Sequence, residues 1–120
     1  MRSSILALVA VLLGWCFTPT VAQDEAAMRK KCTVTVSYTM RGEDAHVSVT
    51  VKNGTKKTLV DPVVRVRFYD KNGTEVTTDA KGYAARIKPG AAKKMETRIW
   101  RSISPDAVKA TGELDYCVFE

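Results

Sequence analysis

The chain has 120 residues, of which 45% are hydrophobic and 27% are charged, and its formal net charge is +6. These proportions exclude a disordered chain, a coiled coil and a collagen-like repeat. After residue 22 no apolar run approaches the ~20 residues of a membrane-spanning helix, so we expect no membrane span in the processed chain. The remaining 98 or so residues hold 18 Lys and Arg against 13 Asp and Glu, enough for one small basic domain.

Residues 1–22 have the features of a secretory signal peptide. Arg2 supplies a positive charge, residues 5–14 form a short apolar run, and small residues precede a cleavage position near Ala22. The sequence therefore predicts an extracytoplasmic protein, periplasmic or secreted. An uncleaved membrane anchor is the alternative.

The expected elements begin with a flexible lead-in over residues 23–31, in which one helical turn is possible. Strict alternation of apolar and polar residues then predicts strands over 33–40 and 46–51, each with one buried side. Asn53-Gly54 follows as a turn, because this dipeptide accepts positive φ angles.

The next strand is expected to start near 58–60 and to be interrupted by Asp61-Pro62, since proline tolerates only an edge or a strand start. Residues 63–69 form the strongest strand pattern of the chain. A second turn at Asn72-Gly73 leads into a hairpin partner over 74–78.

The last third predicts short strands over 83–87 and 94–100, a closing strand over 114–119, and one helical turn over 104–109, with Ser104 as its N-cap. About seven strands with turns every 8–12 residues predict an all-β fold, an immunoglobulin-like antiparallel β-sandwich over residues 32–120. A small open barrel is the competing architecture.

Four segments in order resemble the FxLYD domain family: Val49–Asn53, Val64–Asp70, Asn72–Val76 and Ile87–Gly90. They lie within residues 47–99, roughly half the chain. Tyr69-Asp70 fits the name-giving motif, whereas valine stands at the usual phenylalanine and phenylalanine at the usual leucine. The resemblance implies a small, exported, immunoglobulin-like module, mostly bacterial, and it implies no catalytic residues.

Three cysteines are present, and Cys16 is expected to leave with the signal peptide; the bulky Trp15 before it disfavours a lipoprotein box. Cys32 and Cys117 then remain in an oxidising compartment, which predicts one disulfide between the two ends of the domain. That bridge would close a loop of about 85 residues and add about 4 kcal/mol by the loop-entropy model. A metal or redox pair is disfavoured because no C-x-x-C spacing exists.

The case for an enzyme is weak. His46 is the only histidine, it falls on the polar face of its strand, and no nucleophile motif surrounds it. Glu43 and Asp44 lie in a turn, where carboxylates are solvated. Met40 and Met95 fall on predicted core faces, away from His46, so they do not form a copper site with it. We expect no enzymatic activity, no cofactor and no metal.

The basic residues carry the functional prediction. Arg65, Arg67 and Tyr69 share one face of a strand, and Arg98 shares a face with Trp100. If those strands lie in one sheet, they form a cationic and aromatic contact face for another macromolecule, an acidic protein or an anionic envelope component. Export disfavours nucleic acid. The competing interpretation is that these charges serve solubility alone.

An inhibitor or immunity-type protein that blocks an envelope-acting enzyme is the second hypothesis. The loop over residues 52–61, with Lys56 and Lys57, would be its plug. Asn53 and Asn72 also begin N-x-T sequons. In a eukaryotic source both turns would be expected to carry glycans.

Overall fold

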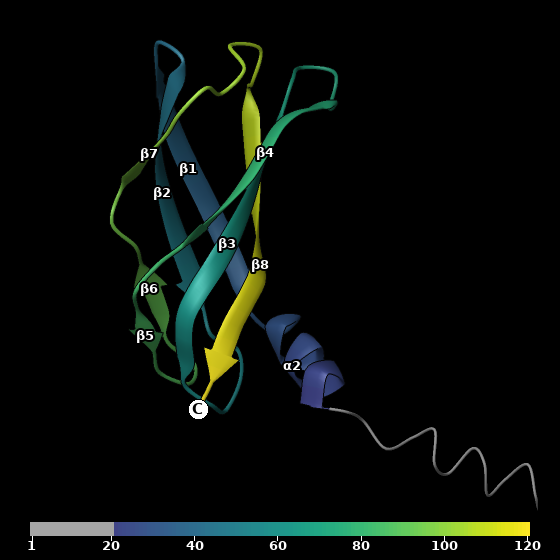
Figure 1. Cartoon of the computed structure of the whole chain (residues 1–120), viewed down its shortest axis with the longest axis vertical. Coiled ribbons are helices and arrows are strands. Elements are labelled where there is room, and N and C mark those ends of the chain that lie inside the picture. The colour runs from purple at the N-terminus through teal and green to yellow at the C-terminus, as the bar shows by residue number, and fades with distance from the viewer. Residues whose placement is uncertain (1–20) are drawn as a thin grey trace, which may run out of the picture.

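The computed structural model describes residues 21–120, and in this part of the chain eight strands form two four-stranded antiparallel sheets. The prediction of an all-β sandwich is confirmed (Figure 1). The elements are α2 (Val21–Arg29), β1 (Thr33–Arg41), β2 (Asp44–Lys52), β3 (Leu59–Tyr69), β4 (Glu75–Gly82), β5 (Arg86–Ile87), β6 (Ala92–Lys94), β7 (Arg98–Trp100) and β8 (Lys109–Phe119). The predicted signal peptide lies almost wholly outside the described residues.

Each sheet is organised around one central strand. In sheet A, β2 pairs with β1 and with both β6 and β7; in sheet B, β3 pairs with β4, β5 and β8. β1 and β8 belong to different sheets but pack together along one long edge. A Cβ atom at Gly112 on β8 would lie 2.6 Å from side-chain carbons of Val34 and Val36, so this close approach requires glycine.

The core lies between the two sheets and follows the alternation seen in the sequence. Every second residue of β2 is buried, and so is every second residue along the second half of β3. Phe68 packs edge-on against Tyr38 and Trp100, with ring centroids 5.2 and 6.4 Å apart. Such buried side chains each stabilise the fold by roughly 1.5–3 kcal/mol.

The expected interruption at Asp61-Pro62 does not end a strand. β3 runs continuously through Pro62, and its register with β8 shifts between Val60 and Val63. Asp61 takes a φ of 49°, and its N–H donates to the carbonyl of Ala85 (2.8 Å). A bulge therefore accommodates a proline within a central strand.

The single strand expected over 94–100 is broken into β6 and β7, and the break reverses its alternation. Lys94 on β6 pairs with Thr50 on β2, and Arg98 on β7 pairs with Val47. Lys94 and Arg98 are four residues apart in the sequence, whereas their partners on β2 are only three apart. One extra residue moves every later side chain to the opposite face of the sheet. Trp100 consequently points into the core, with 1% of its surface exposed.

Two local expectations also change. Residues 23–31, expected as a flexible lead-in, largely belong to the nine-residue helix α2, with Asp24 in its first turn and Arg29 in its last, which suits the helix dipole. The segment 104–109 forms a hydrogen-bonded turn rather than a helical turn, with the N–H of Ala107 donating to the carbonyl of Ser104 (3.1 Å). The closing strand β8 begins at Lys109, earlier than the expected start at residue 114.

Candidate functional site

The structure does not bring the five residues of the predicted contact face together. Arg65, Arg67 and Tyr69 lie on β3 in sheet B, whereas Arg98 and Trp100 lie on β7 in sheet A. Trp100 is a core residue. Arg98 donates to the carbonyl of Gly82, and its guanidinium carbon lies 5.0 Å from the ring centroid of Tyr83. It therefore links two neighbouring segments of the fold.

Acidic residues neutralise the arginines of sheet B. Arg65 pairs with Asp115 (3.1 Å), and Arg67 pairs with both Glu113 (2.6 Å) and Glu75 (3.1 Å). The hydrogen bonds and charges of these two glutamates raise the pKa of Arg67 above its ordinary value. With two arginines against three carboxylates, this outer face is not cationic.

A different surface of the fold collects unpaired positive charge. The β2–β3 loop, the start of β1, the loop after β5 and strand β6 meet at the end of the sandwich where α2 and the C-terminus lie (Figure 1). Eight exposed lysines lie there, and we call this surface the lysine-rich end: Lys30, Lys31, Lys52, Lys56, Lys57, Lys88, Lys93 and Lys94.

Pairing and close contacts bring these segments together. Lys52 is the register partner of both Thr33 on β1 and Ala92 on β6. A Cβ atom at Gly54 would collide with the carbonyl oxygen of Lys31, so glycine allows the loop to touch the turn that follows α2. Of the residues predicted from the sequence to contact a partner, only Lys56 and Lys57 belong to the lysine-rich end, because the others lie on β3 and β7.

A buried asparagine holds the loop that carries Lys56 and Lys57. Asn53 is fully buried, and its side-chain N–H groups donate to the carbonyls of Lys57 (2.7 Å) and Ile87 (2.9 Å). Its side-chain oxygen accepts from the N–H (3.0 Å) and the hydroxyl (2.7 Å) of Thr55. The loop is therefore tied both to itself and to the last residue of β5.

This arrangement corrects the expectation that both Asn-Gly turns are alike. Gly73 has a positive φ of 81°, as the turn at Asn72 requires, but Gly54 does not have a positive φ. Asn72 is exposed, whereas Asn53 is buried with its amide nitrogen engaged. Of the two sequons, the folded domain leaves only the one at Asn72 accessible to a glycosylating enzyme.

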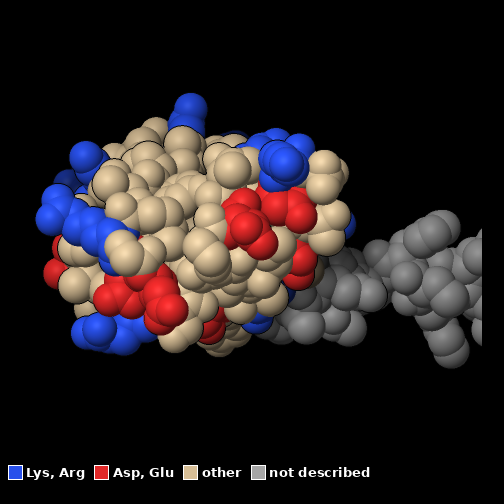
Figure 2. All heavy atoms as spheres, turned by 90° about the horizontal axis from the view of Figure 1, so that it is seen from above, with Lys and Arg blue, Asp and Glu red and all other residues tan. Residues whose placement is uncertain are grey.

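The lysines of the lysine-rich end make no ion pair with the described residues, although the acidic Asp24 and Glu25 of α2 also lie at this end. Within residues 21–120 every ion pair is made by an arginine, and none involves a lysine. At this end Glu120 pairs with Arg86, and Asp61 accepts a hydrogen bond from the N–H of Ala85 (3.3 Å). Figure 2 looks onto the opposite end, where acidic and basic groups are both present around a largely uncharged centre.

The disulfide predicted between Cys32 and Cys117 is not formed in the structure, where both are free thiols. The thiol of Cys32 donates to the carbonyl of Met28 (3.6 Å). Cys117 is fully buried; burial, with Cys32 nearby, raises its pKa to about 11. The two thiols therefore approach the same part of the interior from β8 and from the start of β1.

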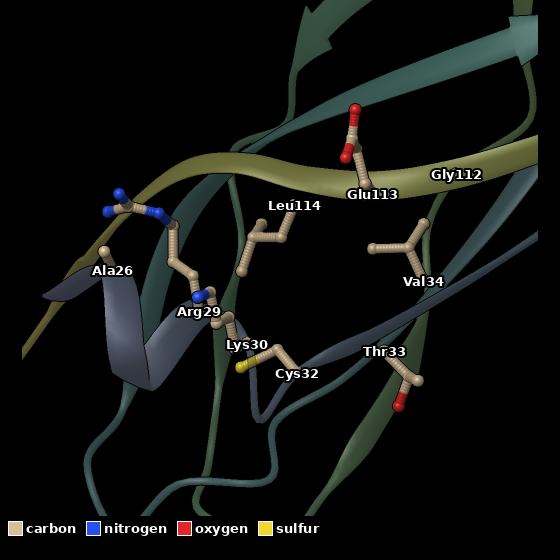
Figure 3. A pocket seen from close by; sticks show the side chains of 9 residues that line it. All are labelled: Ala26, Arg29, Lys30, Cys32, Thr33, Val34, Gly112, Glu113 and Leu114. Atoms are coloured by element: carbon tan, nitrogen blue, oxygen red, sulfur yellow. The ribbon is translucent and has the colours of Figure 1, made fainter.

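A groove of about 400 Å³ lies between α2 and the β1–β8 edge (Figure 3). Val34 and Leu114 point into the space between the two strands, Arg29 and Lys30 line its helical side, and Glu113 points away. Glu113 is already bound to Arg67. The groove therefore combines an apolar floor with a cationic rim.

The remaining candidates lie apart from one another. His46 is half-buried in β2 opposite Thr39 and Ile99, and Asp44 pairs with Arg101 (3.5 Å). Met95 is buried in the core. Among residues 21–120 no three His, Cys, Asp or Glu side chains gather in a metal-binding arrangement. In the same part of the chain, no helix has the length and apolar character to cross a membrane.

No protein-family model matches the chain, and no curated protein matches it.

Proposed function

We propose that this protein is an exported, non-enzymatic β-sandwich module that binds an anionic macromolecule through its lysine-rich end. The observation that carries the proposal is the collection of eight exposed lysines from separate segments at one end of the fold. Unpaired charges of one sign attract partners of the opposite sign and accelerate association. An acidic protein or an anionic envelope component has the required charge.

The contact surface differs from the face expected from the sequence. Arg65 and Arg67 are occupied by carboxylates, and Trp100 is in the core, so those residues present little free charge or aromatic surface. Lys56 and Lys57 are exposed and held by the Asn53 hydrogen bonds. A rigid backbone beneath charged side chains lowers the entropy lost on binding.

Export, the FxLYD resemblance and an oxidised cysteine pair belong to the same proposal. A cleaved signal peptide would deliver the domain to an oxidising compartment, where thiols such as Cys32 and Cys117 are oxidised. The resulting bridge would join the start of β1 to β8, and so lock the edge at which the two sheets meet.

Capture from the native envelope fraction at low and high salt tests this function. The bait is the processed protein, purified after export from the cells that express it. The variants K56E/K57E and K71E/K109E are used as baits in parallel. Lys71 and Lys109 are exposed near the opposite end of the sandwich. Each double variant replaces two lysines by glutamates, so the two variants lower the net charge equally. We expect an anionic partner that elutes with salt and is lost only with K56E/K57E. Equal capture by both variants would contradict the proposal.

A second candidate function is inhibition of an envelope-acting enzyme by the loop over residues 52–61. The observation favouring it is the same Asn53 network, because inhibitory loops act as preorganised plugs. Protease and lysozyme inhibition assays with the processed protein separate this function from simple binding. Inhibition that persists in high salt, where charge attraction is screened, would favour the plug.

A further inference from the structure

We propose that the partner of the lysine-rich end is the surface of a membrane that contains anionic phospholipids. This inference rests on the proposed function and names its partner. The first argument is the chemistry of the cations. The exposed cations that make no ion pair with described residues are lysines, whereas Arg86 is exposed but paired with Glu120, and Arg29 is half-buried in the groove beside α2.

Lysine differs from arginine in what it recognises. An ammonium group is a compact point charge on a flexible stem, whereas a guanidinium presents a planar fork that fits one carboxylate or phosphate. A set of exposed lysines therefore tolerates many arrangements of negative charge. Lipid headgroups, which diffuse within the plane of a bilayer, provide such an arrangement.

The second argument is the distribution of the lysines. The groove beside α2 includes only Lys30 of the set, and a hollow of about 210 Å³ near Tyr83 includes only Lys93 and Lys94. The others extend over the end of the sandwich without converging on a cavity. An extended anionic surface satisfies more of these charges at once than a single small anion.

The third argument is the kind of hydrophobic side chain exposed at this end. Within residues 21–120 the exposed large hydrophobic side chains are Ile99, Val108, Tyr116 and Val118. Ile99 and Val108 lie toward the opposite end, whereas Tyr116 and Val118 lie near the end of β8, at the lysine-rich end. Tyrosine has an apolar ring and a polar tip and is enriched at membrane interfaces, so these side chains are compatible with a lipid surface beside the lysines.

The fourth argument is the position of the chain entry. α2 begins at Val21 and lies beside the lysine-rich end, with the apolar run of residues 5–14 preceding it in the sequence (Figure 1). During export this run is expected to engage the membrane. The lysine-rich end is therefore the end at which the chain enters the domain from the expected signal peptide, and this end would face the bilayer first during export.

Vesicle co-sedimentation of the processed protein tests this inference. The probes are phosphatidylcholine vesicles with and without phosphatidylglycerol, at low and physiological ionic strength. We expect binding only to the mixed vesicles and weaker binding at higher salt. Since each lysine near an anionic surface contributes about fivefold in affinity, K56E/K57E should weaken binding by at least about 25-fold, and K71E/K109E by much less.

Soluble probes distinguish a failure of the membrane inference from a failure of the proposed function. Polyglutamate and polyphosphate represent acidic proteins and anionic polymers, and inorganic phosphate represents an isolated headgroup charge. Binding to a soluble polyanion but not to mixed vesicles would overturn the membrane inference and leave the proposed function standing. Binding to no probe would overturn both. Equal binding to vesicles with and without phosphatidylglycerol would also overturn the inference, because the attraction would not depend on lipid charge.

Discussion

Asn53 and Asn72 stand in the same tripeptide, Asn-Gly-Thr, but the fold uses them differently. The side chain of Asn53 is buried and makes five hydrogen bonds to neighbouring groups, including one from the Cys32 thiol, and these support the loop of Lys56 and Lys57. Asn72 lies in an exposed turn, where its backbone N–H donates to Asp70 (2.9 Å). Buried polar groups stabilise a fold only while their partners remain satisfied.

At the residue scale we therefore predict that Asn53→Ala destabilises the domain and Asn72→Ala does not. Removing the Asn53 amide takes a buried donor from the carbonyls of Ile87 and Lys57, although the Thr55 hydroxyl still donates to Lys57 (3.1 Å); the expected cost is about 2–3 kcal/mol. Urea unfolding of both variants measures the difference. Equal unfolding midpoints for the two variants would show that the Asn53 network contributes little.

At the element scale the outer face of sheet B is held by ion pairs that cross from β3 to β8 and β4. Arg67 is shared between Glu113 and Glu75, one on each neighbouring strand. Cross-strand pairs of opposite charge stabilise a sheet, and like charges in the same positions destabilise it. These arginines therefore act within the sheet.

We predict that Arg67→Glu lowers the Tm, because it places a third carboxylate beside Glu75 and Glu113. The loss should be larger at low salt than at high salt, since the groups are exposed and salt screens their repulsion. Lys71→Glu makes the same change of net charge in an exposed turn. Thermal melts of both variants at two salt concentrations check the prediction, and an equal effect of the two substitutions would contradict it.

At the scale of the whole molecule the two free cysteines come from the two ends of the described domain and from different sheets. Cys32 precedes β1 in sheet A, and Cys117 lies in β8 of sheet B. Burial raises the pKa of Cys117 from 9.0 to about 11, so the folded state holds its proton more tightly than the unfolded state. Below pH 9 both states keep this proton, and between pH 9 and about 11 the unfolded chain releases it while the folded state keeps it.

The reduced protein should therefore lose stability as the pH rises from about 9 through about 11, whereas a disulfide form lacks this loss. The buried tyrosines titrate in both forms, so the comparison isolates the cysteines.

At neutral pH the disulfide should add about 4 kcal/mol to the free energy of unfolding. Urea midpoints of reduced and oxidised protein across this pH range measure both effects. An exported protein whose mass shows both thiols intact would contradict the disulfide itself.

Local patterns in the sequence were sufficient to predict most strands. Alternation of period two over 33–40 and 46–51 corresponds to β1 and β2, because each strand has one face on the core. The same reasoning failed near Trp100, where one extra residue between β6 and β7 reversed the alternation. A bulge depends on the partner strand, so the pattern of a single strand does not reveal it.

The candidate site was predicted less completely than the fold. Lys56 and Lys57 were identified from the sequence, whereas Lys52 and Lys88 gave no separate signal. Their segments lie far apart in the chain, and strand pairing and the Asn53 hydrogen bonds bring them to one end. Likewise, the carboxylates that neutralise Arg65 and Arg67 come from β4 and β8, at positions that no local pattern connects with β3.

The sequence by itself therefore determined the fold class and the predominance of positive charge, because alternation and composition are local properties of the chain. Only the tertiary structure decided which basic side chains have an acidic partner and which are exposed without one. Register pairs the arginines of sheet B with carboxylates, and the loops around Asn53 gather unpaired lysines at one end. Both outcomes depend on contacts between residues distant in sequence, and long-range pairing sets which charges meet a partner within the fold.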